Sequence, residues 1–318
     1  MEQVIYPWGD GRRYNSYSRY FRELFGQRVQ KVAINAGFSC PNRDGTVSTG
    51  GCTFCNNEAF TPSYCSPDKS VKRQIREGKE FHAKRYKDTE KYLAYFQSFS
   101  NTHAPLEKLK KIYDQAFEEE DVVGIVIGTR PDCIDEEKLD YFARMAEEKY
   151  VIIEYGIESC YDSTLNAINR GHDFECAWRA VKATADKGIH VGAHFILGLP
   201  GETMQMMVDQ IEVINELPLD TIKFHQLQIF KDTQMGDEYL RNPYRFRLFE
   251  LDEYIRLFAE ILVRLDPQFV LERFTGEAPP RFHLGHKWGL LRNEQLLAIL
   301  EKFLDRYDLY QGMYSGRL

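Results

Sequence analysis

Three cysteines in the N-terminal part of the chain have the spacing of a metal-binding group. Eleven residues separate Cys40 from Cys52, and Cys52 and Cys55 form a Cys-x-x-Cys pair. A closed structural metal site in a protein usually takes four side-chain ligands. Three thiolates leave one coordination position open, and an open position is where a metal centre performs chemistry.

Three interpretations of these thiols are compatible with their spacing. The first is a [4Fe–4S] cluster with one iron open, in which Phe54 would lie against the ligand of that iron. The second is a structural zinc ion, with Cys65 as the fourth ligand. The third is a set of unrelated buried cysteines. Spacing alone does not choose between them.

The composition is typical of a globular enzyme with a sizeable core. Of the 318 residues, 43% are apolar and 28% are charged. We expect a cytoplasmic protein without a membrane span, because the chain shows neither a leader segment nor a long apolar run. In that compartment the seven cysteines are expected to be reduced. A net charge of −7 argues against a general nucleic-acid-binding protein.

The N-terminal segment departs from this acidic average. Between residues 12 and 31, six basic residues accompany the single acid Glu23. The same stretch contains Tyr14, Tyr17, Tyr20 and Phe25. These aromatic side chains could stack on nucleobases beside phosphate-binding arginines. The alternative, which we favour, is that they form the buried face of an amphipathic helix.

Short apolar segments alternate with amphipathic segments along most of the chain. Segments rich in β-branched residues predict strands over 32–36, 92–98, 122–128, 151–155, 191–197, 221–228 and 268–273. Apolar residues at helical spacing predict helices over 106–119, 136–149, 173–188 and 203–217. Asp135, directly before two glutamates, is the expected N-cap of the second of these helices.

This alternation predicts an α/β fold with a parallel sheet covered by helices. About six βα units are too few for a closed eight-stranded barrel, so we expect a partial (β/α)6 TIM barrel. The barrel core would occupy residues 31–247, after an N-terminal extension over 1–30. A mostly helical C-terminal segment over 248–318 would pack on the core. Function in such folds gathers at the carboxyl ends of the strands.

Polar motifs do follow the second and third expected strands. Ser100, Asn101 and Thr102 come after the second strand, and Arg130 comes after the third. An ordinary polar βα loop would explain the first group equally well. The position of these residues at strand ends makes them candidates for a binding site.

Charged residues occupy similar places further along the chain. Glu158 ends the fourth strand in Tyr-Gly-Ile-Glu-Ser, Arg170 follows twelve residues later, and His194 lies in the fifth strand before Gly-Leu-Pro-Gly-Glu. Arg170 alone would be read as part of a surface ion pair, and a single histidine in an apolar strand as a core residue. Glu272 and Arg273 place charge at the last strand, with no role that the sequence specifies.

Taken together, these motifs resemble the radical S-adenosylmethionine (SAM) superfamily, and in particular its Elongator-like branch. Most members space their cysteines C-x3-C-x2-C, whereas this chain has C-x11-C-x2-C. The longer gap, in Ala-Gly-Phe-Ser-Cys-Pro-Asn-Arg-Asp-Gly-Thr and Gly-Gly-Cys-Thr-Phe-Cys-Asn-Asn, resembles a narrower YhcC/YtqA-like family. The resemblance runs from about residue 14 to about residue 280.

The resemblance implies a [4Fe–4S] cluster and SAM as cofactors. Cys40, Cys52 and Cys55 would be both the metal ligands and the catalytic residues, with Phe54 beside the bound SAM. The loop at residues 100–102 stands where the superfamily binds the SAM amino group. It reads Ser-Asn-Thr here, whereas the superfamily usually has Gly-Gly-Glu.

The strand-end charges would complete the SAM site. By resemblance, Glu158 would hydrogen-bond the SAM ribose, and Arg170 would pair with the SAM carboxylate, which suits the planar donor fork of a guanidinium. His194 belongs to the strand that contacts adenine and ribose. Arg130 would contact SAM or the substrate.

The implied activity is reductive cleavage of SAM to a 5′-deoxyadenosyl radical that abstracts hydrogen from a substrate. The resemblance points to tRNA wobble uridine as that substrate, with conversion of a carboxymethylaminomethyl group to aminomethyl. The expected partners are tRNA and a reductant such as flavodoxin or ferredoxin. Two alternatives remain: a radical SAM enzyme acting on a small metabolite or porphyrin-like substrate, and a non-catalytic zinc-stabilised binding protein.

Overall fold

A seven-stranded parallel sheet forms the centre of the computed structural model, which describes residues 4–83, 89–285, 288 and 291–316. Its strand order is β1-β2-β3-β4-β5-β6-β8. The strands are β1 (Val29–Ile34), β2 (Lys91–Phe96), β3 (Val122–Thr129), β4 (Tyr150–Glu158), β5 (His190–Leu197), β6 (Thr221–Gln226) and β8 (Val270–Arg273). All seven strands expected from the sequence therefore form. A small antiparallel pair, β7 (Ile229–Phe230) and β9 (His283–Leu284), lies apart from the main sheet.

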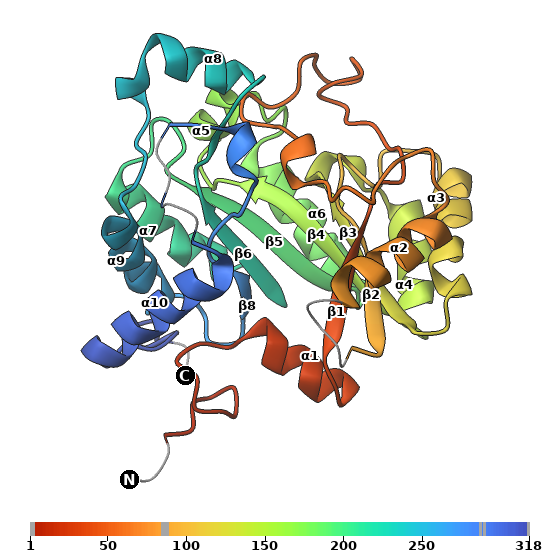
Figure 1. Cartoon of the computed structure of the whole chain (residues 1–318), viewed down its shortest axis with the longest axis horizontal. Coiled ribbons are helices and arrows are strands. Elements are labelled where there is room, and N and C mark those ends of the chain that lie inside the picture. The colour runs from red at the N-terminus through yellow and green to blue at the C-terminus, as the bar shows by residue number, and fades with distance from the viewer. Residues whose placement is uncertain (1–3, 84–88, 286–287, 289–290, 317–318) are drawn as a thin grey trace.

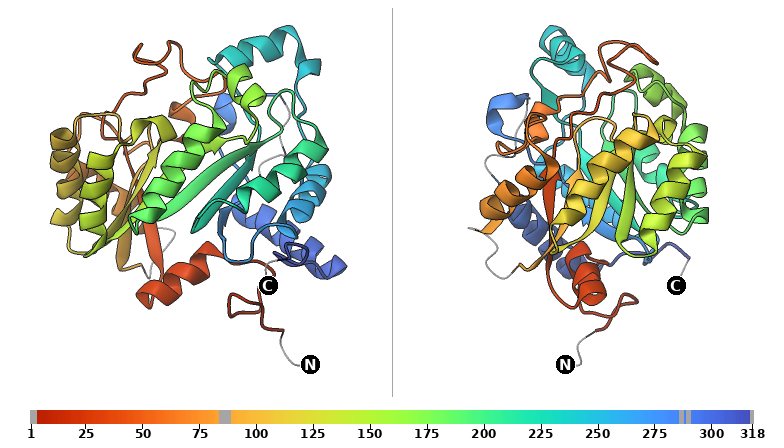
Figure 2. Two further views of the ribbon diagram at one scale, coloured as in Figure 1. Left: turned by 180° about the vertical axis from the view of Figure 1, so that it is seen from behind. Right: turned by 90° about the vertical axis from the view of Figure 1, so that its right-hand side faces the viewer.

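Helices surround this curved sheet, and most of them cover its outer face (Figures 1 and 2). They are α1 (Tyr17–Phe25), α2 (Val71–Ala83), α3 (Leu106–Tyr113), α4 (Glu136–Ala146), α5 (Asp162–Ala167), α6 (Phe174–Asp186), α7 (Met204–Ile214), α8 (Gln234–Arg241), α9 (Leu251–Leu262) and α10 (Asn293–Tyr307). The Asp135 side chain accepts a hydrogen bond from the Lys138 backbone amide, as expected of the N-cap of α4. No helix in the described ranges is long and apolar enough to cross a bilayer.

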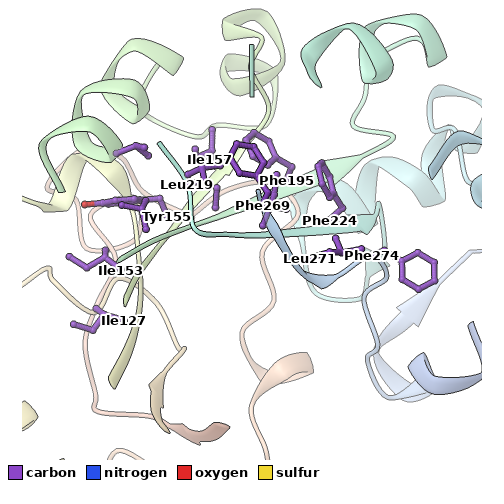
Figure 3. Packing of buried hydrophobic residues seen from close by; sticks show 14 of the residues in the cluster. Ile127, Ile153, Tyr155, Ile157, Phe195, Leu219, Phe224, Phe269, Leu271 and Phe274 are labelled. Atoms are coloured by element: carbon purple, nitrogen blue, oxygen red, sulfur yellow. The ribbon is translucent and has the colours of Figure 1, made fainter. Parts of the chain in front are cut away.

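The architecture confirms the predicted α/β partial barrel. The sheet curls but its edge strands are β1 and β8, so the barrel stays open. Side chains from alternate positions, including Ile127, Ile153 and Phe195, pack outward against the helices (Figure 3). The intervening positions face the barrel interior.

The N-terminal segment closes the lower end of the barrel, opposite the loop that follows β1 (Figure 1). Phe21 of α1 is buried against the lower interior side chains Leu93, Val126 and Ile152. The aromatic residues of this segment therefore form a buried helix face, which confirms the favoured interpretation. The neighbouring Arg13 pairs with carboxylates of the C-terminal helical region.

The predicted division at residues 30 and 247 stays a prediction. The sheet itself draws on all of these regions, since β1 begins at Val29 and β8 lies within the C-terminal segment. Leu271 of β8 also bridges in parallel to Ser16, directly before α1. Segments from both ends of the chain therefore pair at the β8 edge of the barrel.

Candidate active site

The carboxyl ends of the parallel strands open into a cavity of about 230 Å³. The loop after β1 places all three predicted metal ligands on its wall, together with Phe54. The other predicted site residues that line the cavity are Ser100, Arg130, Glu158, Arg170 and His194. Strand ends far apart in the sequence therefore meet at one site, as the parallel fold requires.

The cysteine loop is held by backbone hydrogen bonds to distant segments. The Thr53 amide donates to Ile168 O at 3.0 Å, and the Met235 amide donates to Thr53 O at 2.8 Å. The Asn42 side-chain amide donates to Asn169 O at 2.6 Å and to Arg170 O at 3.0 Å. These bonds fix the loop between the end of α5 and the start of α8.

Hydrogen-bond donors surround the thiols. Arg170 Nη1 lies 3.4 Å from Cys52 Sγ, and Asn57 Nδ2 lies 3.5 Å from Cys55 Sγ. Burial and the neighbouring Cys52 raise the pKa of Cys55 to about 11, while Arg43 acts in the opposite direction. A metal centre here would have to displace that proton, and the donors would then stabilise the thiolates it binds.

The donor set fits an iron–sulfur cluster. Within the described ranges, no group of three or more His, Cys, Asp or Glu side chains is arranged around a single ion position. The three thiols share one cavity wall instead, which suits a cluster in which each thiolate binds a different iron. Cys65, the ligand that would have closed a zinc site, donates its thiol to Ala33 O at 3.1 Å and does not line the cavity.

An ion-paired group lies beside the thiols on the cavity wall. Relative to β5, strand β4 gains one residue between Gly156 and Glu158, and Glu158 adopts a positive φ of 73°. Glu158 Oε2 lies 2.9 Å from His194 Nδ1, and Glu158 Oε1 lies 3.6 Å from Arg170 Nη2. Left-handed backbone at a residue other than glycine persists only where its surroundings enforce it, often at functional sites.

The charge of Glu158 is held by its partners. Burial raises the pKa of this carboxyl, but His194 and then Arg170 outweigh burial and bring it to about 2. Glu158 is therefore an ionised acceptor at neutral pH, aimed into the cavity beside a guanidinium.

The loop after β2 contributes less to the cavity than the sequence predicted. Asn101 and Thr102 are fully buried and do not line it. The Asn101 amide donates to Phe96 O and Gly128 O, and Thr102 bonds the Thr129 hydroxyl at 2.6 Å. Both side chains hold the loop in place, and of the three predicted residues only Ser100 reaches the cavity wall.

Several buried polar atoms on the cavity-lining residues have unused hydrogen-bonding capacity. Ser100 Oγ, Arg130 Nη1 and Arg170 Nε have no hydrogen-bond partner in the described structure. The remaining Arg130 nitrogens donate to Asp132 at 2.8 and 2.7 Å. Unpaired buried polar atoms are costly, and a polar ligand such as SAM would satisfy them.

The sequence did not predict a group of paired charges inside the barrel, of which Glu154 and Lys223 line the cavity. Lys31 Nζ lies 2.7 Å from both Glu154 Oε1 and Glu272 Oε2, and Lys223 Nζ lies 2.5 Å from Glu154 Oε2 and 3.0 Å from Glu272 Oε1. We call these four side chains the ion square. The signal was present in Val-Ile-Ile-Glu-Tyr, because a charge at an alternating position of a buried strand must point inward.

Glu202, at the end of the Gly-Leu-Pro-Gly-Glu motif, is buried behind the cavity wall. Its Oε1 accepts a hydrogen bond from Ser159 at 2.5 Å. Burial raises the pKa of this carboxyl to about 7, against the smaller lowering effect of Ser159 and Thr164. The folded protein therefore holds a proton here that the unfolded chain releases above its ordinary pKa of 4.5.

We predict that Glu202→Gln makes stability less dependent on pH. As pH rises from about 4.5 to about 7, the wild-type protein loses up to about 3 kcal/mol of unfolding free energy, because only the folded state keeps the carboxyl protonated. The Gln variant has no such loss, so its free energy of unfolding rises relative to that of wild type between pH 5 and pH 8. Denaturant unfolding at pH 5 and at pH 8 measures this difference in unfolding free energy. The control is Glu212→Gln, at an exposed position of α7. An equal difference at the two pH values would contradict the prediction.

Comparison with known proteins agrees with this geometry. Residues 40–214 match the profile of the Radical SAM superfamily, and residues 219–304 match the Radical SAM C-terminal domain. The uncharacterized protein YtqA of Bacillus subtilis is 37% identical over 100% of this chain and 98% of its own length. The tRNA uridine(34) acetyltransferase of Methanocaldococcus jannaschii is 27% identical over 44% of this chain and 26% of its own.

A solved structure shares the fold. The Elp3 protein of Methanocaldococcus infernus superposes with a TM-score of 0.65 at 18% identity, over 89% of this chain and 64% of that chain. This chain thus spans less than two thirds of that larger protein. The superfamily match rejects the interpretation of the chain as a non-catalytic, zinc-stabilised binding protein. The chain belongs to the radical SAM superfamily, as a SAM-dependent enzyme with a [4Fe–4S] cluster.

Proposed function

We propose that Cys40, Cys52 and Cys55 ligate the cluster and that the neighbouring Glu158–Arg170–His194 group binds SAM. The three thiols and the Glu158–Arg170–His194 group line one cavity, and Arg170 lies next to Cys52, so a single bound SAM would be within reach of both. When both are bound, the cluster would supply one electron for the cleavage of SAM, which yields a radical able to abstract hydrogen.

The wall residues would orient SAM. Glu158, ionised and buried, is suited to accept hydrogen bonds from ribose hydroxyls. Arg170 Nε is an unused donor and would suit a carboxylate acceptor. Phe54, Ser100 and Arg130 line the same cavity, whereas Asn101 and Thr102 support the loop that carries Ser100. The enclosing side chains would limit the access of water to a reactive intermediate.

We further propose that the substrate is the wobble uridine of tRNA, with removal of a carboxymethyl group from its carboxymethylaminomethyl side chain. The observation that carries this proposal is the similarity to a relative named tRNA uridine(34) acetyltransferase, which covers 44% of this chain. A reductant such as flavodoxin or ferredoxin would supply the electron.

An exposed aromatic ring in the segment that follows α8 supports an RNA substrate. Helix α8 begins beside the cysteine loop, since the Met235 amide donates to Thr53 O. Just beyond α8, Tyr244 is 97% exposed and lies in sequence between Arg241 and Arg245. An exposed ring among arginines is suited to stack on an unpaired base. The basic N-terminal segment, by contrast, lies at the other end of the barrel (Figure 1).

Gly156→Ala should weaken SAM binding. A Cβ at this position would lie 2.7 Å from both Arg170 Nη2 and Glu158 Oε1, so the ion-paired group would have to shift. We expect a loss of SAM affinity of roughly tenfold or more, since such a shift breaks at least one charge-assisted hydrogen bond. Equilibrium dialysis with the reconstituted enzyme measures it.

The control is Gly26→Ala at the end of α1. A Cβ there contacts nothing within 4 Å, although its positive φ of 72° also strains alanine. This variant should lose stability but keep its SAM affinity. If Gly156→Ala binds SAM as tightly as Gly26→Ala, the proposed SAM pocket is wrong.

The tRNA proposal is tested by the nucleosides of cellular tRNA. Strains with the wild-type chain, without it, and with Cys52→Ala are compared by mass spectrometry. We expect carboxymethylaminomethyl uridine to accumulate, and aminomethyl-derived uridine to fall, in the last two strains alike. Unchanged wobble nucleosides in the deletion strain would reject tRNA as substrate and favour a small-molecule substrate.

A further inference from the structure

Arg273 is a cation on the cavity wall without a carboxylate partner in the part of the chain that the structure describes. It is the last residue of β8 and lines the cavity together with Lys223, Tyr95 and His225. Among the described residues, no carboxylate forms an ion pair with its guanidinium, in contrast to the neighbouring Lys223. A cation in a partly enclosed space without a counter-ion is unfavourable unless a ligand supplies one.

A local irregularity of the sheet aims this side chain inward. Ile222 pairs with Leu271 but Lys223 pairs with Arg273, so β8 has one extra residue at this point. Glu272 and Arg273 therefore both stand opposite Lys223. Without the extra residue, strict alternation would turn one of the two side chains away from the interior. Such bulges commonly redirect side chains beside active sites.

Most of the charged side chains around Arg273 already have partners of opposite charge. The ion square contains two lysines and two glutamates, so its formal charge is zero. Glu158 is matched by Arg170, and Arg130 by Asp132. Burial, then the neighbouring His194, lowers the pKa of His225 to about 3, which keeps that ring neutral. Two lining guanidiniums have no carboxylate partner among the described residues: Arg43, which donates to Cys55 O at 2.9 Å beside the predicted cluster ligands, and Arg273 at the end of β8.

We propose that Arg273 binds a carboxylate carried by the substrate. A guanidinium donates two parallel hydrogen bonds to a carboxylate, and one carboxylate would neutralise the charge of Arg273. The Tyr95 hydroxyl, which lies 3.3 Å from Lys223 Nζ, lines the same cavity and offers a further polar contact. The inference rests on the proposed function, in which the group to be removed from the wobble uridine ends in a carboxylate.

Binding of two synthetic anticodon stem-loops to the reconstituted, SAM-loaded enzyme tests this assignment. One stem-loop bears carboxymethylaminomethyl uridine at the wobble position, and the other bears aminomethyl uridine. We expect wild type to bind the first roughly ten- to a hundredfold more tightly, the range of a charge-assisted pair. Arg273→Gln should abolish this preference, Arg273→Lys should retain part of it, and the exposed control Arg256→Gln should retain all of it.

The outcomes separate the two levels of the proposal. If wild type prefers the carboxylated stem-loop and Arg273→Gln keeps that preference, the role of Arg273 is wrong while the proposed substrate stands. If Arg273→Gln weakens SAM binding to the same extent, Arg273 serves the cofactor and the assignment is again overturned. If wild type shows no preference, the proposed substrate is wrong and the inference falls with it. Partial rescue by Arg273→Lys separates lost recognition from misfolding.

Discussion

Parallel strand pairing is the constraint on which the rest of this structure depends. Because seven strands run in one direction, their carboxyl ends meet at one edge of the sheet. Cys52 thereby contacts a residue 118 positions later, Arg170, at the wall of a single cavity. The opposite edge is free to be closed by α1, whose Phe21 fills the lower interior.

Charge compensation inside the barrel follows from this arrangement. The upper interior carries ionised groups that burial alone would disfavour, so each needs a partner. Glu158 is held ionised by His194 and Arg170, while the ion square balances two lysines with two glutamates. Two extra residues, one in β4 and one in β8, direct Glu158 and Arg273 into the same space. The upper interior of the barrel is thus suited to bind charged ligands, and it is not filled by apolar side chains.

Much of the fold could be predicted because local patterns decide it. Runs of β-branched residues became strands, and Asp135 became a cap, since both depend on near neighbours. The ion square could not be paired from sequence, because Lys31 and Glu272 are 241 positions apart. The same limit explains Asn101, a plausible ligand at a strand end whose amide instead holds two backbone carbonyls.

The central claim is that the cavity beside Cys52 cleaves SAM. The most direct measurement incubates the anaerobically reconstituted enzyme with SAM and dithionite and quantifies 5′-deoxyadenosine and methionine. Wild type is predicted to form both products, and Cys52→Ala to form neither. Intact SAM in an iron-loaded wild-type sample, or cleavage by Cys52→Ala at the wild-type rate, would contradict the account.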